Sequence, residues 1–278
     1  MTLAEAIRTV VPRFPADSPE LDAQLLLAEA IRRDRTYLYT WPERQLTPEE
    51  QQRFEALAAR RMAGEPVAHI LERGAFWTLE LKVAANTLIP RPETERLVEV
   101  VLELDLPDDA RILDLGTGTG AIALALAAER PDWQVVATDR DDTIVALARE
   151  NARLNALERV QFLVSDWFGA LASSRYDLIV SNPPYIDPDD PHLAQGDVRF
   201  EPDTALVAQD GGLADLRHIL QEARHWLTEG GVLAMEHGWD QADDVRTLME
   251  DAGYEQVRLE RDYGGRPRLT LGIWPGGR

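Results

Sequence analysis

The chain of 278 residues contains no cysteine, and Lys82 is its only lysine. Without cysteine the chain forms no disulfide bridge, offers no thiolate nucleophile and builds no cysteine-ligated zinc site. No apolar run approaches the roughly 18 residues that a membrane-spanning helix needs. The early acid Glu5 departs from the basic and then apolar layout of a signal peptide. We therefore expect a cytoplasmic protein without a membrane segment or membrane partner.

Positive charge is also scarce. Lysine and arginine together number 29 against 49 acids, which gives a formal net charge of −20 at pH 7. Residues 1–73 hold 10 arginines and 12 acids, so most of the excess acid lies in the rest of the chain. Such a balance is poorly suited to gripping the phosphate backbone of a nucleic acid. We therefore expect no direct nucleic acid binding.

Two helix starts stand out near the beginning of the chain. Ser18 followed by Pro19 is an N-cap and first-turn pair. The helix that follows is expected to bury one face, made of Leu21, Leu25 and Ala28. Thr47 and Glu50 form a capping box that opens a second helix. We expect residues 1–73 to form a small helical domain that recognises the substrate, because this part carries no chemical motif.

From Leu88 onward short apolar runs alternate with amphipathic segments. Strands are predicted near 111–115, 134–138, 160–164, 176–181 and 231–236, helices near 121–129, 141–155 and 213–228, and two closing edge strands near 254–259 and 268–274. This alternation predicts an α/β fold with a mainly parallel, doubly wound, Rossmann-like sheet. We therefore divide the chain into the helical domain, a β-hairpin linker over 74–88 and a catalytic domain over 89–278.

A glycine-rich turn joins the first of these strands to a helix. It consists of Gly116, Thr117, Gly118, Thr119 and Gly120. Glycine permits positive φ and lets a ligand approach the main chain closely. Asp114, just before the turn, suits a cationic ligand better than a pyrophosphate. Asp139, at the end of the next strand, is placed to accept hydrogen bonds from both hydroxyls of a ribose.

Together these features resemble the S-adenosylmethionine site of the class I, Rossmann-like methyltransferases. The resemblance implies S-adenosyl-L-methionine as cofactor and S-adenosyl-L-homocysteine as product. It also implies that the glycine turn passes beneath the methionine and ribose, that Asp139 binds the ribose, and that Trp167 packs on the adenine, with Asp166 near its amino group. The plain structural alternatives are a core tryptophan at position 167 and a helix N-cap at Asp139.

The most informative segment is Ser181-Asn182-Pro183-Pro184-Tyr185, at the end of the fourth strand. Two consecutive prolines hold a turn rigid and leave carbonyl oxygens free. The Asn182 side chain and the Pro183 carbonyl supply two acceptors, and Tyr185 an aromatic wall, which together suit a planar group bearing NH2. Held there, the nitrogen is aimed at the methyl group of the cofactor, and the acceptor contacts strengthen as positive charge develops on it. We expect Asn182, Pro183 and Tyr185 to be catalytic, Pro184 to join them in substrate binding, and Asn182 also to contact the cofactor.

The Asn-Pro-Pro-Tyr segment resembles motifs of two enzyme groups. One methylates adenine N6 or guanine N2 in nucleic acids, and the other methylates glutamine N5 in proteins. The negative charge argues against the first group, which stays the alternative. Further segments resemble the release-factor glutamine methyltransferases, the HemK family, namely residues 64–68, 89–97, 198–206, 230–241 and 262–266. This resemblance implies that the substrate is the glutamine of the Gly-Gly-Gln motif in peptide chain release factors, and hence a role in translation termination. We expect a monomer.

Residues 186–212 lack clear periodicity and hold Asp187, Asp189, Asp190 and His192. These are ligand types that a metal site uses, but a polar flap crossing the active site is the plainer interpretation. We expect no metal. Glu201 is expected to anchor the flap. Arg91 has three candidate partners, namely the cofactor carboxylate, Glu93 and Glu201.

Overall fold

The computed structural model describes residues 1–277 and divides into two compact units. The first unit contains Met1–Arg73 together with Pro191–Phe200, and the second contains Gly74–Asp190 and the chain from Glu201 onward. Residues 191–200 therefore group with the helices of the first unit although they lie more than 100 positions later in the sequence. Within residues 1–277, no helix has the length and the apolar character needed to cross a membrane.

The first unit is built from short helices. They are α1 (Leu3–Val10), η1 (Val11–Arg13), α2 (Pro19–Ile31), α3 (Arg35–Thr40), α4 (Pro48–Met62) and α5 (Val67–Leu71). The later segment 191–200 adds the 3-10 turns η2 (Pro191–Ala194) and η3 (Val198–Phe200). The predicted capping box is confirmed, because the Thr47 hydroxyl accepts from the Glu50 N–H while the Glu50 carboxylate accepts from the Thr47 N–H. Leu3, Leu26, Leu27 and Phe54 form the centre of the core.

The prediction for α2 is wrong in two details. The helix begins at Pro19 as expected, but the Ser18 side chain makes no capping hydrogen bond. Its inner face also differs in part from the expected one, because Ala28 is buried as predicted but Leu21 is 39% exposed, whereas Ala23, Leu26 and Leu27 are fully buried. The physical reason is that α2 packs against α1, α3, α4 and α5 on several sides, so its apolar residues follow no single stripe.

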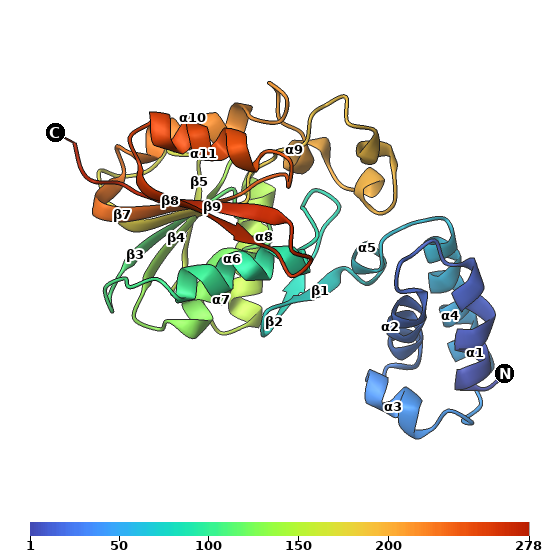
Figure 1. The fold of residues 1–278 in the computed structure, drawn as a ribbon. Helices are drawn as coiled ribbons and strands as arrows, with labels where there is room; N and C mark the ends of the chain where they lie inside the picture. The colour runs from blue at the N-terminus through green and yellow to red at the C-terminus, as the bar shows by residue number, and fades with distance from the viewer. Residues whose placement is uncertain (278) are drawn as a thin grey trace. The chain divides into compact units, whose positions relative to one another are not determined.

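The second unit contains a seven-stranded sheet in the order β5-β4-β3-β6-β7-β9-β8. The strands are β3 (Arg111–Leu115), β4 (Gln134–Asp139), β5 (Gln161–Val164), β6 (Tyr176–Ser181), β7 (Leu227–Glu236), β8 (Glu255–Arg261) and β9 (Pro267–Ile273). Strands β3 to β7 pair in parallel, and β9 pairs antiparallel with both β7 and β8. The predicted mainly parallel α/β sheet is confirmed. Of the two strands predicted to close the sheet, however, only β8 lies at an edge, because β9 inserts between β7 and β8 (Figure 1).

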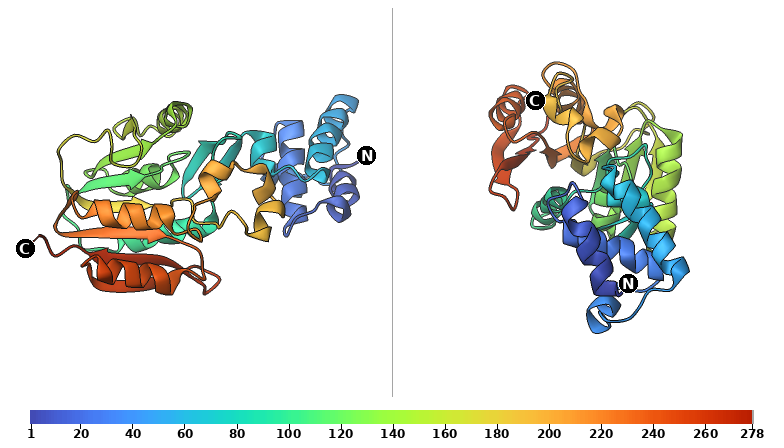
Figure 2. Two further views of the ribbon diagram at one scale, coloured as in Figure 1. Left: turned by 90° about the horizontal axis from the view of Figure 1, so that it is seen from above. Right: turned by 90° about the vertical axis from the view of Figure 1, so that its right-hand side faces the viewer.

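Helices cover both faces of this sheet (Figures 1 and 2). Alternate strand residues point to opposite faces. Ile112 and Leu178 pack with α6 (Pro92–Leu102), α7 (Ala121–Glu129) and α8 (Asp142–Leu154). Leu113 and Ile179 pack with α10 (Ala214–Ala223) and α11 (Ala242–Asp251) on the other face. Helix α10 ends earlier than predicted, because the chain at Trp226 already accepts a hydrogen bond from the Tyr176 N–H at the start of β6.

The hairpin expected within residues 74–88 is present as β1 (Arg73–Phe76) and β2 (Leu79–Lys82). The buried Asn151 side chain on α8 exchanges two hydrogen bonds with the backbone of Lys82. Its amide also donates to the Thr119 carbonyl at 2.8 Å. One asparagine therefore ties the hairpin to the glycine-rich turn and fixes the position of both.

Candidate active site

The glycine-rich turn leaves the carboxyl end of β3, the edge at which open α/β sheets bind their ligands. Gly116, Gly118 and Gly120 have φ values of 69°, 54° and 87°, a region that side-chain-bearing residues disfavour. The Thr117 N–H donates to the Thr138 carbonyl at 2.9 Å, which holds the turn against β4. A Cβ atom at Gly118 would meet nothing within 4 Å. The turn therefore presents bare backbone to open space.

Asp114 supports the turn from below. It is fully buried, and its Oδ2 accepts from the Thr117 hydroxyl at 2.6 Å. Burial raises the pKa of Asp114 to about 7, against the opposing effect of the Thr117 hydrogen bond. Asp114 does not line the cleft described below. Its position indicates that it shapes the turn and does not touch a ligand.

Asp139 lies at the end of β4, beside the turn. Its Oδ2 accepts from the Gly118 N–H at 3.0 Å and its Oδ1 from the Asp141 N–H at 3.3 Å. Burial raises the pKa of Asp139, and these backbone hydrogen bonds partly offset that rise. The N-cap of α8 is Asp141, which accepts from the Thr143 N–H. Asp139 is therefore not the N-cap of α8, as the alternative interpretation proposed. Each of its carboxylate oxygens can accept a further hydrogen bond.

Trp167 follows β5 in a turn held by Ser165, whose hydroxyl donates to the Trp167 carbonyl and accepts from the Ala170 N–H. The backbone φ of Trp167 is 46°. Its ring lies so close to Gly116 that a Cβ there would be 3.3 Å from the ring. The ring is half-buried, packs partly on the core beneath α10 and also lines the cleft. The tryptophan therefore serves the core and the cleft at once.

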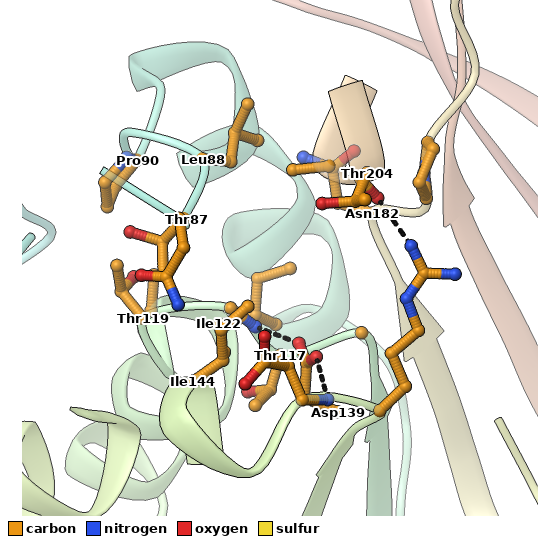
Figure 3. A pocket seen from close by; sticks show the side chains of 18 of the residues that line it. Thr87, Leu88, Pro90, Thr117, Thr119, Ile122, Asp139, Ile144, Asn182 and Thr204 are labelled. Carbon is orange, nitrogen blue, oxygen red and sulfur yellow. Dashed lines mark hydrogen bonds between the residues drawn. The ribbon is translucent and has the colours of Figure 1, made fainter. Parts of the chain in front are cut away.

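One cleft brings most of the sequence-predicted residues together (Figure 3). Its empty volume is about 1120 Å³, open solvent included. Its lining includes Gly116, Thr117, Gly118, Thr119, Asp139, Trp167, Asn182 and Pro184, whereas Gly120, Pro183 and Tyr185 do not line it. Sequence reasoning missed other lining residues, among them Thr87, Leu88, Pro90, Ile122, Ile144 and Thr204. Their types are common in any core or loop, so no sequence signal distinguishes them.

Asn182 and the two prolines form a corner at the end of β6. The preceding Ser181 hydroxyl donates to the Leu115 carbonyl at 2.8 Å, which fixes the corner to β3. The Asn182 side-chain amide donates through Nδ2 to the Thr94 hydroxyl at 3.2 Å. In the part of the chain that the structure describes, neither Asn182 Oδ1 nor the Pro183 carbonyl accepts a hydrogen bond. Two acceptor oxygens of the corner are therefore left for a ligand.

Tyr185 does not line the cleft. Its hydroxyl donates to Glu236 Oε1 at 3.2 Å, behind the corner. Burial, followed by the neighbouring Glu236 carboxylate, raises the pKa of Tyr185 far above its ordinary value. Glu236 ends β7 and also accepts from the Thr94 hydroxyl at 2.8 Å. Burial raises the pKa of Glu236 to about 7. Neither Thr94 nor Glu236 is among the site residues that the sequence predicts.

The sequence predicts a flap without regular secondary structure over residues 186–212. The structure instead contains η2, η3 and α9 (Asp203–Leu206) in this segment. Glu201 is the expected anchor. Its buried carboxylate accepts from the Ile89 N–H at 2.9 Å and pairs with Arg91, which also lines the cleft. Thr204 and Ala205 line the cleft. Among residues 1–277, no group of three or more acidic or histidine side chains is arranged to hold a metal ion.

Comparisons with known proteins first define the class. One family model, described as Methyltransferase small domain, matches residues 93–214, and another, described as PrmC N-terminal domain, matches residues 5–71. A methyltransferase structure from Pyrococcus furiosus is 20% identical with a TM-score of 0.55, covering 79% of this chain and 98% of that chain. The T. thermophilus 16S rRNA N2 G1207 methyltransferase in complex with AdoMet and guanosine is 21% identical with a TM-score of 0.52, covering 72% of this chain and 49% of that chain. The fold is that of the class I methyltransferases.

Closer relatives then give the family. Release factor glutamine methyltransferases from Escherichia coli and Aliivibrio fischeri are each 52% identical to this chain. The first alignment covers 96% of both chains, and the second covers 93% of this chain and 92% of the relative. The relative of the same name from Pseudomonas aeruginosa is 53% identical, covering 93% of this chain and 94% of the relative. The chain belongs to the family of release factor glutamine methyltransferases.

Proposed function

We propose that this enzyme transfers a methyl group from S-adenosyl-L-methionine to the side-chain nitrogen, N5, of the glutamine in the Gly-Gly-Gln motif of peptide chain release factors. Release factors are then its protein partners, and the reaction takes place in the cytoplasm. The observation that carries the proposal is the corner at Asn182, a residue that lines the cleft and whose Oδ1, like the carbonyl of the adjoining Pro183, accepts no hydrogen bond from the described residues. The names of the relatives support the choice of substrate.

The residues of the cleft fit the cofactor. The open backbone at Gly118 gives room for the methionine and ribose parts, and Asp139 retains acceptor capacity for the ribose hydroxyls. The flat Trp167 ring offers a surface for the adenine. When bound, the cofactor supplies a methyl group that is already activated by its attachment to a sulfonium sulfur.

The corner is suited to a primary carboxamide. Asn182 Oδ1 and the Pro183 carbonyl would each accept one N–H of the glutamine side chain. An amide nitrogen is a poor nucleophile because its lone pair is delocalised, so fixing its direction contributes much of the rate. Contacts from the two acceptors strengthen as positive charge develops on the nitrogen, which favours the transition state over the ground state. Pro184 and Tyr185 keep the corner rigid, and the amide loses its proton after transfer.

Mass spectrometry of purified release factor, incubated with the enzyme and cofactor, tests this proposal. We expect one added methyl group on the glutamine of the Gly-Gly-Gln motif. The Asn182→Ala variant should give at least about 100-fold slower turnover, while calorimetry shows cofactor affinity within about threefold of the parent. Normal turnover by that variant would remove the proposed role of Asn182. Transfer to RNA or DNA, with none to release factor, would establish the nucleic acid alternative instead.

A further inference from the structure

We propose that Thr94 and Glu236 are positioning residues that hold the Asn182 side chain with its oxygen toward the substrate amide. This inference rests on the proposed function, because it concerns the acceptor that the proposed substrate needs. The three side chains come from separate elements, since Thr94 lies in the first turn of α6, Asn182 follows β6 and Glu236 ends β7. They form one hydrogen-bonded chain.

An asparagine amide has two chemically opposite ends. Its oxygen only accepts and its NH2 only donates, and a half-turn about the last side-chain bond exchanges them. With the oxygen toward the cleft, the amide can hold an N–H of the substrate. With the NH2 toward the cleft, it would face the donors of the substrate amide and repel them. Catalysis at this corner therefore requires that one of the two orientations be enforced.

Thr94 enforces the choice through its single hydroxyl proton. That proton is donated to Glu236 Oε2 at 2.8 Å. The hydroxyl therefore faces Asn182 with lone pairs only, and it accepts from Nδ2 at 3.2 Å. In the inverted orientation, two oxygens without a proton between them would face each other. The direction of the Thr94 hydroxyl thus decides which end of Asn182 reaches the cleft.

Glu236 in turn sets the direction of the Thr94 hydroxyl. An ionised carboxylate can only accept, and each of its oxygens receives one hydroxyl, from Thr94 and from Tyr185. The charged groups that act on Glu236 are Arg268 on the neighbouring strand β9, which favours the ionised form, and Glu93 on α6, which opposes it. Arg91 acts on the adjoining Tyr185.

Protonation of Glu236 would release this control. A neutral carboxyl can donate to Thr94, and the Thr94 hydroxyl is then free to donate to Asn182 Oδ1 and turn the amide over. The ionised form is required for activity, and the pKa of Glu236 lies near 7 because of burial. Turnover should therefore fall as the pH falls below about 7. Glu236→Gln, which keeps the shape and can donate, represents the inactive arrangement at every pH.

Steady-state methylation of release factor provides the first test. We expect kcat to fall about 10- to 100-fold in Thr94→Val and Glu236→Gln, with cofactor affinity within about threefold of the parent, and Thr94→Ser to recover most of the loss. Thr270→Val is the matched control. It removes the hydroxyl of another buried threonine, the partner of His237, outside this chain of hydrogen bonds, so kcat should stay near that of the parent. Turnover within threefold of the parent in both Thr94→Val and Glu236→Gln would overturn the proposal.

A second measurement needs neither release factor nor cofactor, and so separates this inference from the proposed function. In protein labelled with 15N at asparagine, the side-chain NH2 signal of Asn182, assigned by its loss in Asn182→Ala, is followed from pH 5 to pH 9. We expect the signal to titrate with a midpoint near pH 7 in the parent and to stay constant in Glu236→Gln and Thr94→Val. A parent signal that does not move with pH would contradict the inference even if methylation is normal. A titrating signal in a protein that does not methylate release factor would leave the inference standing and refute the proposed function.

Discussion

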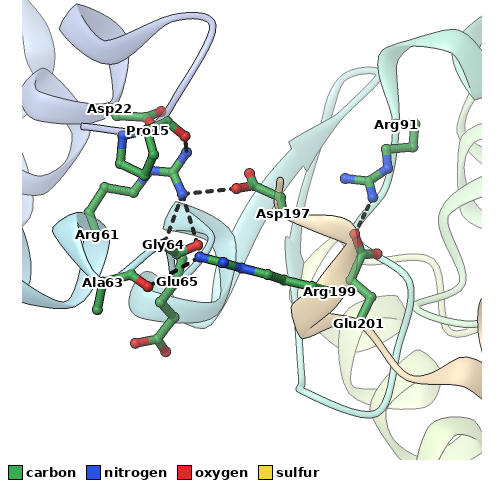
Figure 4. Close-up of polar contacts among 10 residues, drawn as sticks. All are labelled: Pro15, Asp22, Arg61, Ala63, Gly64, Glu65, Arg91, Asp197, Arg199 and Glu201. Atoms are coloured by element: carbon green, nitrogen blue, oxygen red, sulfur yellow. Dashed lines mark hydrogen bonds and ion pairs between the residues drawn. The ribbon is translucent and has the colours of Figure 1, made fainter. Parts of the chain in front are cut away.

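The guanidinium of Arg61 donates a hydrogen bond to Asp197 Oδ1 at 2.9 Å across 136 positions of sequence. The Arg61 side chain is only 3% exposed, and it also pairs with Asp22 at 2.7 Å (Figure 4). Nearby, the Arg199 guanidinium donates to the Ala63 carbonyl. These contacts explain why residues 191–200 belong to the helical unit. They tie the segment that follows the Asn182 corner to the N-terminal helices.

Replacement of Arg61 should therefore destabilise the helical unit. Arg61→Leu leaves the partly buried Asp22 without its partner, and we expect a loss of up to about 3 kcal/mol in the free energy of unfolding. Residues 191–200 should also become sensitive to limited proteolysis. The neighbouring Arg60 is the matched control, because its pair with Glu65 is more exposed and Arg60→Leu should cost less than about 1 kcal/mol. Equal losses in the two variants, measured by urea unfolding, would contradict this account.

Local sequence patterns predict a large part of the second unit and the start of one helix in the first. The strands, the glycine-rich turn and the capping box at Thr47 depend on residues close together in the chain, and the structure contains all of them. Asp139 is found in the same way, because it ends the strand that follows the turn. The HemK resemblance supplied the substrate class, which no periodicity or composition could give.

Features that depend on distant partners escape sequence reasoning. Thr94 and Glu236 are 142 positions apart, and nothing in either local sequence shows that they share a hydrogen bond. The insertion of β9 between β7 and β8, and the grouping of residues 191–200 with the helices, likewise follow from packing across the chain. The hydrogen bond from the Tyr185 hydroxyl to Glu236, 51 positions later in the chain, is a further contact of this kind.

The glycine-rich turn offers a comparison of two glycines. At Gly118 an added Cβ meets nothing within 4 Å, whereas at Gly120 it lies 3.1 Å from Leu124 and 3.4 Å from Ala148. Both positions have positive φ, which costs an alanine about 1–2 kcal/mol. We expect Gly118→Ala to lower cofactor affinity at least about 10-fold because its methyl group occupies ligand space, and Gly120→Ala to lose more stability. Calorimetry measures the cofactor affinity and thermal unfolding measures the stability. If Gly120→Ala lowers cofactor affinity more than Gly118→Ala does, and Gly118→Ala loses more stability, the turn does not receive the ligand.

Asp139 gives a prediction for the ribose contact. Asp139→Asn replaces one acceptor oxygen by a donor, so it loses one of the hydrogen bonds proposed for the ribose hydroxyls. A hydrogen bond to a charged group contributes about 1.5–3 kcal/mol, and we expect cofactor affinity to fall about 10- to 100-fold. Asp142→Asn, an exposed change in the first turn of α8, is the control. If calorimetry shows the same affinity for both variants, Asp139 does not bind the cofactor.

Glu236 also allows a prediction about stability, opposite in sign to its effect on activity. Its pKa is raised from 4.5 to about 7 in the folded protein, so the folded state holds a proton that the unfolded chain releases earlier. The carboxyl therefore favours folding below about pH 4.5, and this contribution is lost as the pH rises to about 7. Above that range the buried charge costs up to about 3 kcal/mol.

Glu236→Gln removes the charge, so its free energy of unfolding relative to the parent should increase from pH 5 to pH 8. Urea unfolding at the two pH values measures this difference, and a constant difference would show that Glu236 does not titrate there. A variant that is more stable at pH 8 yet turns over more slowly would show that the enzyme keeps a destabilising buried charge for the sake of the Asn182 orientation.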